Sequence, residues 1–387
     1  MSHFHNFSNR IDIWTNITFY FSLIFLFVLP WRNALVIVDV GTSITIGWLF
    51  GLMLGISWLI SIYLKKSIRK PDTFHILFFL FTLWVIVSII WASKISLVVE
   101  DIVRYLYIFG VIIAFWDVYR SERRLNFGFQ SYIIGVFILM TASIVDYFVI
   151  SSYSRATPFG LNPNELGSHV VLGVPIAYYL IRSNLTTEYQ KFINYIFIFF
   201  AILTAFISGS RTAIVVLTVV MAAILGISTS QLNNQRDKYV SSIIVGITTI
   251  FSWLLLPPKI QSRIMTVPQL IQDGDLGNRQ EIWLSGYHLF IENPIFGIGS
   301  GHFPLEVGIT AHSVYLSILV ELGVIGLFMF IAILISAFKS VITSKDTYQW
   351  SLIFLCCFLV ILPNDMGFVA VLLVLNFIII GRNINSV

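Results

Sequence analysis

Residues 312–338 read HSVYLSILVELGVIGLFMFIAILISAF, and Glu321 is the single charged residue in this stretch. A run of about 20 apolar residues is long enough to cross the hydrocarbon core of a bilayer as an α-helix. Soluble globular proteins carry about 25% charged residues, whereas this chain of 387 residues has 11% and is 57% hydrophobic. The composition therefore excludes a soluble fold and predicts an all-α, polytopic membrane protein.

Eleven further apolar runs flank this one, which predicts about twelve transmembrane helices in a single integral membrane domain over residues 1–387. The last two runs are short and share the break Pro363-Asn364-Asp365, so a re-entrant pair is an alternative to two full crossings. The twelve runs lie at approximately 12–30, 42–63, 73–92, 97–117, 127–150, 166–181, 192–208, 212–229, 239–256, 312–338, 349–362 and 366–381.

The distribution of lysine and arginine predicts the orientation, because short loops rich in these residues stay in the cytoplasm. If the amino terminus is inside, fifteen of the 23 lysines and arginines fall in cytoplasmic loops, seven fall in external loops, and Arg104 lies within a span. Both termini are therefore expected in the cytoplasm, as in a multi-pass protein of the cytoplasmic (inner) membrane. The net charge of +4 then follows from topology and indicates no nucleic-acid partner.

One predicted external loop, residues 257–311 between the ninth and tenth runs, is far longer than the other connections. Loops of this length are usually functional or disordered. This loop contains aromatic and apolar residues and a plausible helix around 277–291, which Pro294 would stop. We expect an ordered cap on the outer membrane surface.

The ionisable residues inside or beside the predicted spans are expected near the external face. Asp101, Arg104, Glu165 and Arg211 lie at the outer ends of their spans, and only Glu321 is predicted to lie deeper. Charge inside a bilayer is costly, and an ion-coupled carrier needs ionisable groups near the midplane. The pattern favours an enzyme acting on a lipid-borne substrate over a lipid-linked oligosaccharide transporter or a scaffold. Snorkelling of each charge to the interface is the structural alternative.

The tenth run places His312 at the outer end of a helix face that also carries two glycines. The glycines are expected to let another helix approach closely, and Glu321 falls on the opposite face. An imidazole below the large loop can act as a general base near pH 7, and a structural histidine is the alternative. The residues on the predicted inward face are His312, Tyr315, Leu316, Leu319, Gly323 and Gly326.

The segment HSVYLSILVELGVIG, residues 312–326, resembles the pattern of O-antigen ligases, which is His, then Asn, Ser or Gln, nine residues, Gly, two residues and Gly. SGSRTAI, with Arg211, and GNRQEIWLSGYHLFIENPIFGIGSG, with Arg279, resemble the same superfamily of O-antigen ligases and polymerases. LNPNELG (161–167) and NDMG (364–367) are weaker similarities. The specific motifs define a catalytic-motif region at about 208–326.

This resemblance implies a GT-C type glycosyltransferase fold with its active site on the periplasmic or extracellular face. It implies transfer of a glycan from undecaprenyl diphosphate to a hydroxyl, on lipid A core in a ligase and on a lipid-linked glycan in a polymerase. No metal ion, cofactor or nucleotide sugar is implied. His312 would be the general base, and Arg211 and Arg279 would bind the diphosphate, which suits the planar guanidinium fork. An interfacial structural arginine is the alternative for each.

Asp101 and Arg104 are three residues apart on one predicted helix, so they can pair with each other or contact the lipid diphosphate as substrate-binding residues. His288 and His302 are less favoured candidate bases. The nearest approach to a metal motif is Asp273-x-Asp275, which is typical of a solvated turn, and Gly297, Gly299 and Gly301 are expected to form a flexible turn.

One position departs from the ligase pattern. Some ligases carry an Arg-x-x-x-Leu element in the external region, but the position expected to be leucine after Arg279 is Trp283, and Leu284 follows it. This departure leaves an O-antigen polymerase as the alternative function. The two activities share donor and base and differ in the acceptor, which the sequence does not display.

Overall fold

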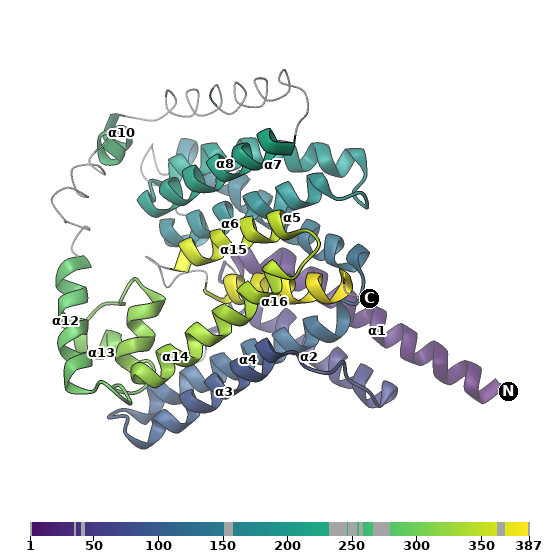
Figure 1. The fold of residues 1–387 in the computed structure, drawn as a ribbon, viewed down its shortest axis with the longest axis horizontal. Helices are drawn as coiled ribbons and strands as arrows, with labels where there is room; N and C mark the ends of the chain where they lie inside the picture. The colour runs from purple at the N-terminus through teal and green to yellow at the C-terminus, as the bar shows by residue number, and fades with distance from the viewer. Residues whose placement is uncertain are drawn as a thin grey trace.

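The structure is a computed structural model and describes residues 2–34, 36–39, 43–150, 158–231, 246, 254, 258–265, 279–361 and 368–385. Within these ranges the predicted apolar runs are helical (Figure 1). The ninth run, residues 239–256, falls almost entirely outside the described residues, as do the break at 363–365 and the pair Asp273 and Asp275.

The helices in chain order are α1 (Ser2–Val28), α2 (Ile46–Lys65), α3 (Thr73–Val87), α4 (Ile95–Val118), α5 (Glu122–Val145), α6 (Pro163–Arg182), α7 (Glu188–Ser208), α8 (Arg211–Gln231), α10 (Pro258–Met265), α12 (Arg279–Glu292), α13 (Phe303–Val307), α14 (Val314–Ile342), α15 (Thr347–Ile361) and α16 (Phe368–Asn385). Short 3-10 or π turns follow α1, α3 and α5 and precede α6.

Six helical segments in the described part of the chain are long and apolar enough to cross a membrane. Three shorter apolar helical segments, at 211–226, 347–360 and 369–384, accompany them. The polytopic membrane fold is therefore confirmed, while the number of twelve crossings stays a prediction. The six segments are Asp12–Trp31, Ile46–Lys65, Thr73–Ile90, Glu122–Val149, Glu188–Ser208 and Val314–Ile342.

The predicted all-α architecture has one small exception. Two short antiparallel strands, β1 (Val36–Asp39) and β2 (Ser43–Thr45), form a hairpin between α1 and α2. The segment is rich in valine and isoleucine, whose β-branched side chains favour extended backbone. It is too short to cross a membrane, so the hairpin leaves the helical architecture unchanged.

Two helices form the centre of the bundle. Residues 165–180 of α6 are all buried, and so are residues 370–381 of α16. A helix that is apolar on every side is stable only when neighbours surround it. α6 packs against α5, α7, α8 and α15, and α16 packs against α4, α5, α14 and α15. The main core is thus a continuous cluster from α1 to α16, and a smaller cluster of Phe303, Ala311 and Val320 lies apart from it.

The start of α6 is fixed by local sequence. Asn162 is the N-cap, and its side-chain oxygen accepts a hydrogen bond from the Asn164 backbone N–H at 2.8 Å. Pro163 follows at the first helical position, where its missing N–H has no helical partner to lose. These caps determine that Glu165 lies in the first turn of the helix, at the end of the bundle.

Polar contacts join one end of the bundle, which we call the loop end. Arg32, after α1, donates to Glu165 of α6 over 3.4 Å, and Ser210, before α8, donates to Asn164 over 2.9 Å. Hydrogen bonds also tie the segment around α12 and α13 to the outer turns of α4 and α14. In Figure 1, α12 and α13 lie at the left, away from both chain termini.

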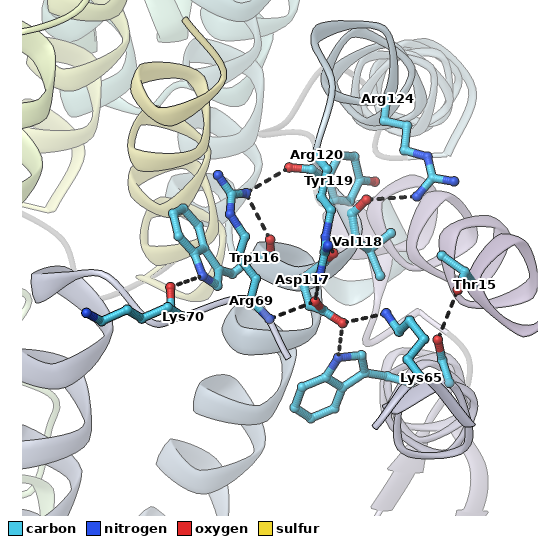
Figure 2. Close-up of polar contacts among 12 residues, drawn as sticks. Thr15, Lys65, Arg69, Lys70, Trp116, Asp117, Val118, Tyr119, Arg120 and Arg124 are labelled. Atoms are coloured by element: carbon cyan, nitrogen blue, oxygen red, sulfur yellow. Dashed lines mark hydrogen bonds and ion pairs between the residues drawn. The ribbon is translucent and has the colours of Figure 1, made fainter. Parts of the chain in front are cut away.

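The opposite end, which we call the basic end, gathers Lys65, Arg69, Arg120, Arg124 and Arg382 around α2, α4, α5 and α16. Its centre is Asp117, whose side chain has no exposed surface. Figure 2 shows the Asp117 carboxylate among Lys65, at 2.9 Å, the Arg69 backbone N–H, at 3.1 Å, and Arg120.

The Arg69 guanidinium lies 3.6 Å from the centre of the Trp116 ring and donates to the backbone oxygens of Trp116 and Tyr119. Burial and the nearby charge of Arg120 lower the pKa of Arg69 from its ordinary value. These bonds lock the α2–α3 connection onto the end of α4. These five basic residues, which the sequence predicts on one side of the membrane, therefore lie at the same end of the bundle.

Candidate active site at the loop end

Helix α14 is broken at Gly323, whose backbone has φ 68° and ψ −171°. The break frees carbonyl groups that a continuous helix would bond internally. The chain around 298 supplies the missing donors: Ile298 N–H bonds the Val320 carbonyl at 3.0 Å, and Gly299 N–H bonds the Glu321 carbonyl at 2.9 Å. The loop before α13 is therefore attached to α14 through the backbone.

Glycine is required at 323 because the loop backbone approaches so closely. A Cβ at this position would lie 2.1 Å from the Ile295 carbonyl oxygen. At Gly326 a Cβ would lie 2.3 Å from the Cβ of Leu322 in the same helix. The expectation that these glycines admit a second helix is wrong, because Gly323 admits a loop and Gly326 accommodates the break.

Glu321 fastens the docked loop through its side chain. Its side chain is buried, and Oε1 accepts a hydrogen bond from the Phe303 backbone N–H at 3.0 Å. The helical wheel had set Glu321 opposite His312, but the break at Gly323 and the docked loop surround both sides of the helix here. Glu321 thus holds the start of α13.

Asp101 and Arg104 form the predicted pair, with 2.8 Å between Oδ1 and Nη1. The second Asp101 oxygen accepts from the Ser300 hydroxyl at 2.7 Å, which fastens the same loop to α4. The Asp101 side chain is 9% exposed, whereas that of Arg104 is 61% exposed. The geometry therefore gives Asp101 a positioning role and leaves the Arg104 guanidinium accessible.

The candidate base His302 is fully buried and uses both ring nitrogens. Nε2 accepts from the Lys94 backbone N–H at 3.0 Å, so Nδ1 carries the proton and donates to the Ser300 carbonyl at 3.0 Å. A ring held in this way is structural. The flexible turn expected over Gly297, Gly299 and Gly301 is likewise wrong, because the loop is held by hydrogen bonds to α14, although all three glycines have positive φ.

His312 lies two residues before α14 and is half-buried. Its φ of 51° is in the left-handed region, which few residues other than glycine adopt. Nδ1 lies 3.4 Å from the Thr310 hydroxyl. Strained backbone of this kind costs of order 1–3 kcal/mol and concentrates at functional sites. Because of this conformation, the backbone at His312 does not continue the helix that begins at Val314.

Arg279 is the first residue of α12 and is half-buried. One turn later, Trp283 Nε1 donates to the Ala311 carbonyl at 3.2 Å, directly before His312. The residue that departs from the ligase pattern therefore joins the helix carrying Arg279 to the segment carrying His312. Leu284, the neighbouring leucine, is 57% exposed and makes no such connection.

Arg211 is the first residue of α8, on the other side of α6. Gly209, with φ 59°, ends α7 and turns the chain, and Ser210 bonds Asn164 at the start of α6. The Arg211 Nε is buried and makes no hydrogen bond within the described residues. A buried guanidinium donor without a partner is costly, so this arginine retains capacity to bind an anion.

A cavity of about 430 Å³ lies between α2, α4, α6, α16 and the end of α1. Its walls include Arg32, Arg104 and Glu165, together with Tyr105 and Tyr107. The Arg32 Nη2 donates to Glu165, while Nη1 is buried and makes no hydrogen bond within the described ranges. Arg32 is a site residue that the sequence did not reveal, because nothing in the sequence pairs it with α4 and α6.

Two groups of residues thus form at the loop end. One comprises Arg279 and His312 with their connecting Trp283, and the other comprises Arg32, Arg104 and Glu165 around the cavity. Arg211 adjoins the second group, because Asn164, the partner of Ser210, directly precedes Glu165. The convergence of His312, Arg211 and Arg279 on one pocket stays a prediction.

Residues 196–331 match the model of the O-antigen ligase family. This match covers 136 of the 387 residues. It runs from α7 into α14 and contains Arg211, Arg279, His312, Gly323 and Gly326, so the resemblance drawn from the motifs is confirmed. Together with the membrane-spanning helices, the O-antigen ligase region marks a membrane enzyme of ligase or polymerase type. No curated protein matches the chain.

Proposed function

We propose that this chain is a membrane glycosyltransferase of the O-antigen ligase type, which transfers a glycan from undecaprenyl diphosphate to an acceptor hydroxyl in surface polysaccharide or lipopolysaccharide assembly. The observation that carries the proposal is the hydrogen bond between Trp283 and the Ala311 carbonyl, which joins the helix beginning with Arg279 to His312. Both residues lie inside the region that matches the O-antigen ligase family. The proposed reaction uses no metal ion or cofactor.

In the proposed reaction the acceptor oxygen attacks the anomeric carbon of the donor glycan. As the new carbon–oxygen bond forms, the bond to the diphosphate oxygen breaks, and His312 takes the proton of the acceptor hydroxyl. The leaving undecaprenyl diphosphate keeps the bonding electron pair. Its growing negative charge is stabilised by guanidinium groups, which stay protonated and donate in pairs to phosphate oxygens.

Arg211 and Arg279 are the proposed ligands of the diphosphate. The support for Arg211 is its buried and unpaired Nε at the start of α8. Arg104 and Arg32 line the cavity that Glu165 also borders, and they are proposed to add further guanidinium groups for a lipid diphosphate. Asp101, which bonds both Arg104 and Ser300, is proposed to orient Arg104 and the loop.

The proposed topology sets the basic end in the cytoplasm and the loop end outside. It is supported by the five lysines and arginines around Asp117, because basic loops are retained inside. Both termini are then cytoplasmic, and residues 257–311 form the external loop between the ninth and tenth helices of a GT-C-like domain. The catalytic-motif region, 208–326, borders that loop.

The same superfamily's polymerase activity is the second candidate. It is favoured by Trp283, which replaces the leucine of the Arg-x-x-x-Leu element expected in some ligases. The one polar group of the Trp283 side chain, its Nε1–H, donates to the Ala311 carbonyl. In that case the acceptor is a sugar of a second lipid-linked unit in place of lipid A core.

The test uses the purified protein in lipid nanodiscs with an undecaprenyl-diphosphate-linked glycan. Lipid A core and a second lipid-linked unit are offered separately as acceptors, and the extended product separates ligase from polymerase. His312→Ala is expected to abolish transfer to either acceptor. His288→Ala is the matched control, because His288 is exposed on α12 and is expected to remain active. Full transfer by His312→Ala would refute the assignment.

A further inference from the structure

A second cavity, of about 620 Å³, lies at the loop end beside the last turn of α12. One wall is aromatic: the ring centres of Trp91 and Phe296 are 5.4 Å apart, and Trp84 lies 5.5 Å from Trp91 and 6.0 Å from Phe296. Trp84 is fixed in turn by its Nε1, which donates to the Leu322 carbonyl at 3.0 Å. Two of these rings, those of Trp91 and Phe296, border the cavity.

The polar lining of this cavity has a single sign of charge. Glu292, Asn293, Glu306 and Ser93 contribute oxygen acceptors, and the described lining holds no lysine, arginine or histidine. Two carboxylates without a cation repel phosphate and anionic lipid head groups. Their short stems also resist burial in hydrocarbon, since a carboxylate is costly in a bilayer. The lining therefore suits a neutral ligand that is rich in hydroxyl donors.

Phe296 is the exposed ring of the aromatic wall, and its backbone is rigidly held. Phe296 is 51% exposed, but the flanking backbone is fixed by Gly297 N–H to the Asn293 carbonyl and Val324 N–H to the Pro294 carbonyl, both at 3.0 Å. A loop attached at the break in α14 keeps its shape without a ligand. Such preorganisation reduces the entropy that binding costs.

We propose that this cavity binds a neutral segment of a glycan chain. The rings of Trp91 and Phe296 stack against the apolar faces of sugar rings, and Glu292, Asn293 and Glu306 accept hydrogen bonds from sugar hydroxyls. The inference rests on the proposed function, because it adds a distal subsite for the glycan that the enzyme transfers or extends.

The position of the cavity supports this role. It lies at the carboxyl end of α12, while Arg279 begins the same helix of 14 residues, about 21 Å away at 1.5 Å per residue. A chain of a few sugars covers that distance. Glu306, on α13, lies six residues before His312 in the same loop, and Figure 1 shows α12 and α13 side by side. A glycan chain whose reacting end lies near Arg279 and His312 can therefore extend along α12 to this cavity.

The experiment measures equilibrium binding of a defined probe to the full-length protein in nanodiscs. The probe is the glycan released by mild acid from the lipid-linked donor of the cells that make this protein. Saturation-transfer NMR and calorimetry report binding to wild type. Trp91→Ala is expected to weaken binding about tenfold, the loss of one stacking contact, and Glu306→Ala about fivefold, the loss of a hydrogen bond. Trp91→Phe, which keeps a ring, should recover most of the affinity.

Tyr348→Ala on α15 is the matched control, because Tyr348 is an exposed aromatic residue far from the cavity, and its removal should leave binding unchanged. Glu306 is exposed, so its variant keeps the fold even if Trp91→Ala is destabilised. Absence of binding to wild type, or unchanged affinity in the Glu306 variant and in a folded Trp91 variant, overturns the proposal. If the Trp91 and Glu306 variants lose binding to phosphatidylglycerol vesicles and keep their affinity for the glycan, the cavity is a membrane-contact surface and the proposal is overturned.

Transfer assays separate this inference from the proposed function. If both hold, Trp91→Ala and Glu306→Ala raise KM for a long-chain substrate and leave transfer with a single-repeat substrate near wild type, whereas His312→Ala loses transfer and keeps glycan binding. If the cavity variants have a normal KM for the long-chain substrate and the His312 variant is inactive, the glycan subsite is refuted and the catalytic assignment stands. If the His312 variant is active and the cavity variants bind the glycan more weakly, the catalytic assignment is refuted and the glycan subsite stands.

Discussion

The replacement Gly323→Ala tests how the loop before α13 is attached to α14. At φ 68° and ψ −171°, a residue with a Cβ is strained by about 1–3 kcal/mol. The new Cβ would also lie 2.1 Å from the Ile295 carbonyl oxygen, so the loop or the helix must shift. A shift weakens the hydrogen bonds of Ile298 and Gly299 to α14, each worth about 0.5–1.5 kcal/mol. We expect a total loss of about 2–6 kcal/mol in the free energy of unfolding.

The assay is unfolding of the purified protein in detergent with increasing SDS, followed by circular dichroism. Chymotrypsin cleavage after Phe296 and Leu305 reports release of the loop under native conditions. Gly110→Ala is the matched control, because an added Cβ in α4 meets nothing within 4 Å and alanine favours a helix. If Gly323→Ala unfolds at the wild-type SDS fraction and resists cleavage as wild type does, the proposed attachment of the loop is refuted.

Three further replacements probe other contacts. Glu321→Ala removes the acceptor of the Phe303 N–H and is expected to cost about 1–3 kcal/mol of unfolding free energy and to speed chymotrypsin cleavage near α13, and an unchanged cleavage rate would contradict the role given to Glu321. Arg32→Lys keeps the charge but loses the planar fork, so KM for the lipid-linked donor should rise about tenfold with little change in the unfolding transition, and an unchanged KM would remove Arg32 from the donor site. Asp117→Ala leaves Lys65 without its buried partner and should cost about 3–5 kcal/mol of unfolding free energy, measured by SDS titration, whereas wild-type stability would show that the basic end does not hold α2 to α4.

Much of the architecture was predictable because it depends on composition and local spacing. The low charge and the long apolar runs predicted the membrane helices, and the spacing of His312, Gly323 and Gly326 predicted the family. The pairing of Asp101 with Arg104 also followed from their separation on one helix. Each of these conclusions uses residues that are near one another along the chain.

The predictions that failed concerned what lies against a helix. The helical wheel of the tenth run assumed an unbroken helix, and it could not show that Gly323 takes a positive φ. The wheel therefore gave Glu321 no partner, since Phe303, whose N–H it accepts, belongs to a loop that returns to the helix only in three dimensions. Arg32 was overlooked for the same reason, because its neighbours Arg104 and Glu165 come from distant helices.

The amino-acid sequence alone determined that the chain is a membrane protein, where its helices lie, and which residues carry the O-antigen ligase pattern. The membrane helices follow from the cost of exposing polar backbone and charge to lipid, because each helix satisfies its backbone hydrogen bonds within its own segment. The ligase pattern is a matter of residue spacing along the chain. Only the tertiary structure decided that the loop before α13 docks on a broken helix, that Trp283 joins Arg279's helix to His312's segment, and that two separate cavities lie at the loop end. Those features arise from packing between segments far apart in the chain, and packing depends on shape in space, which residue order does not display.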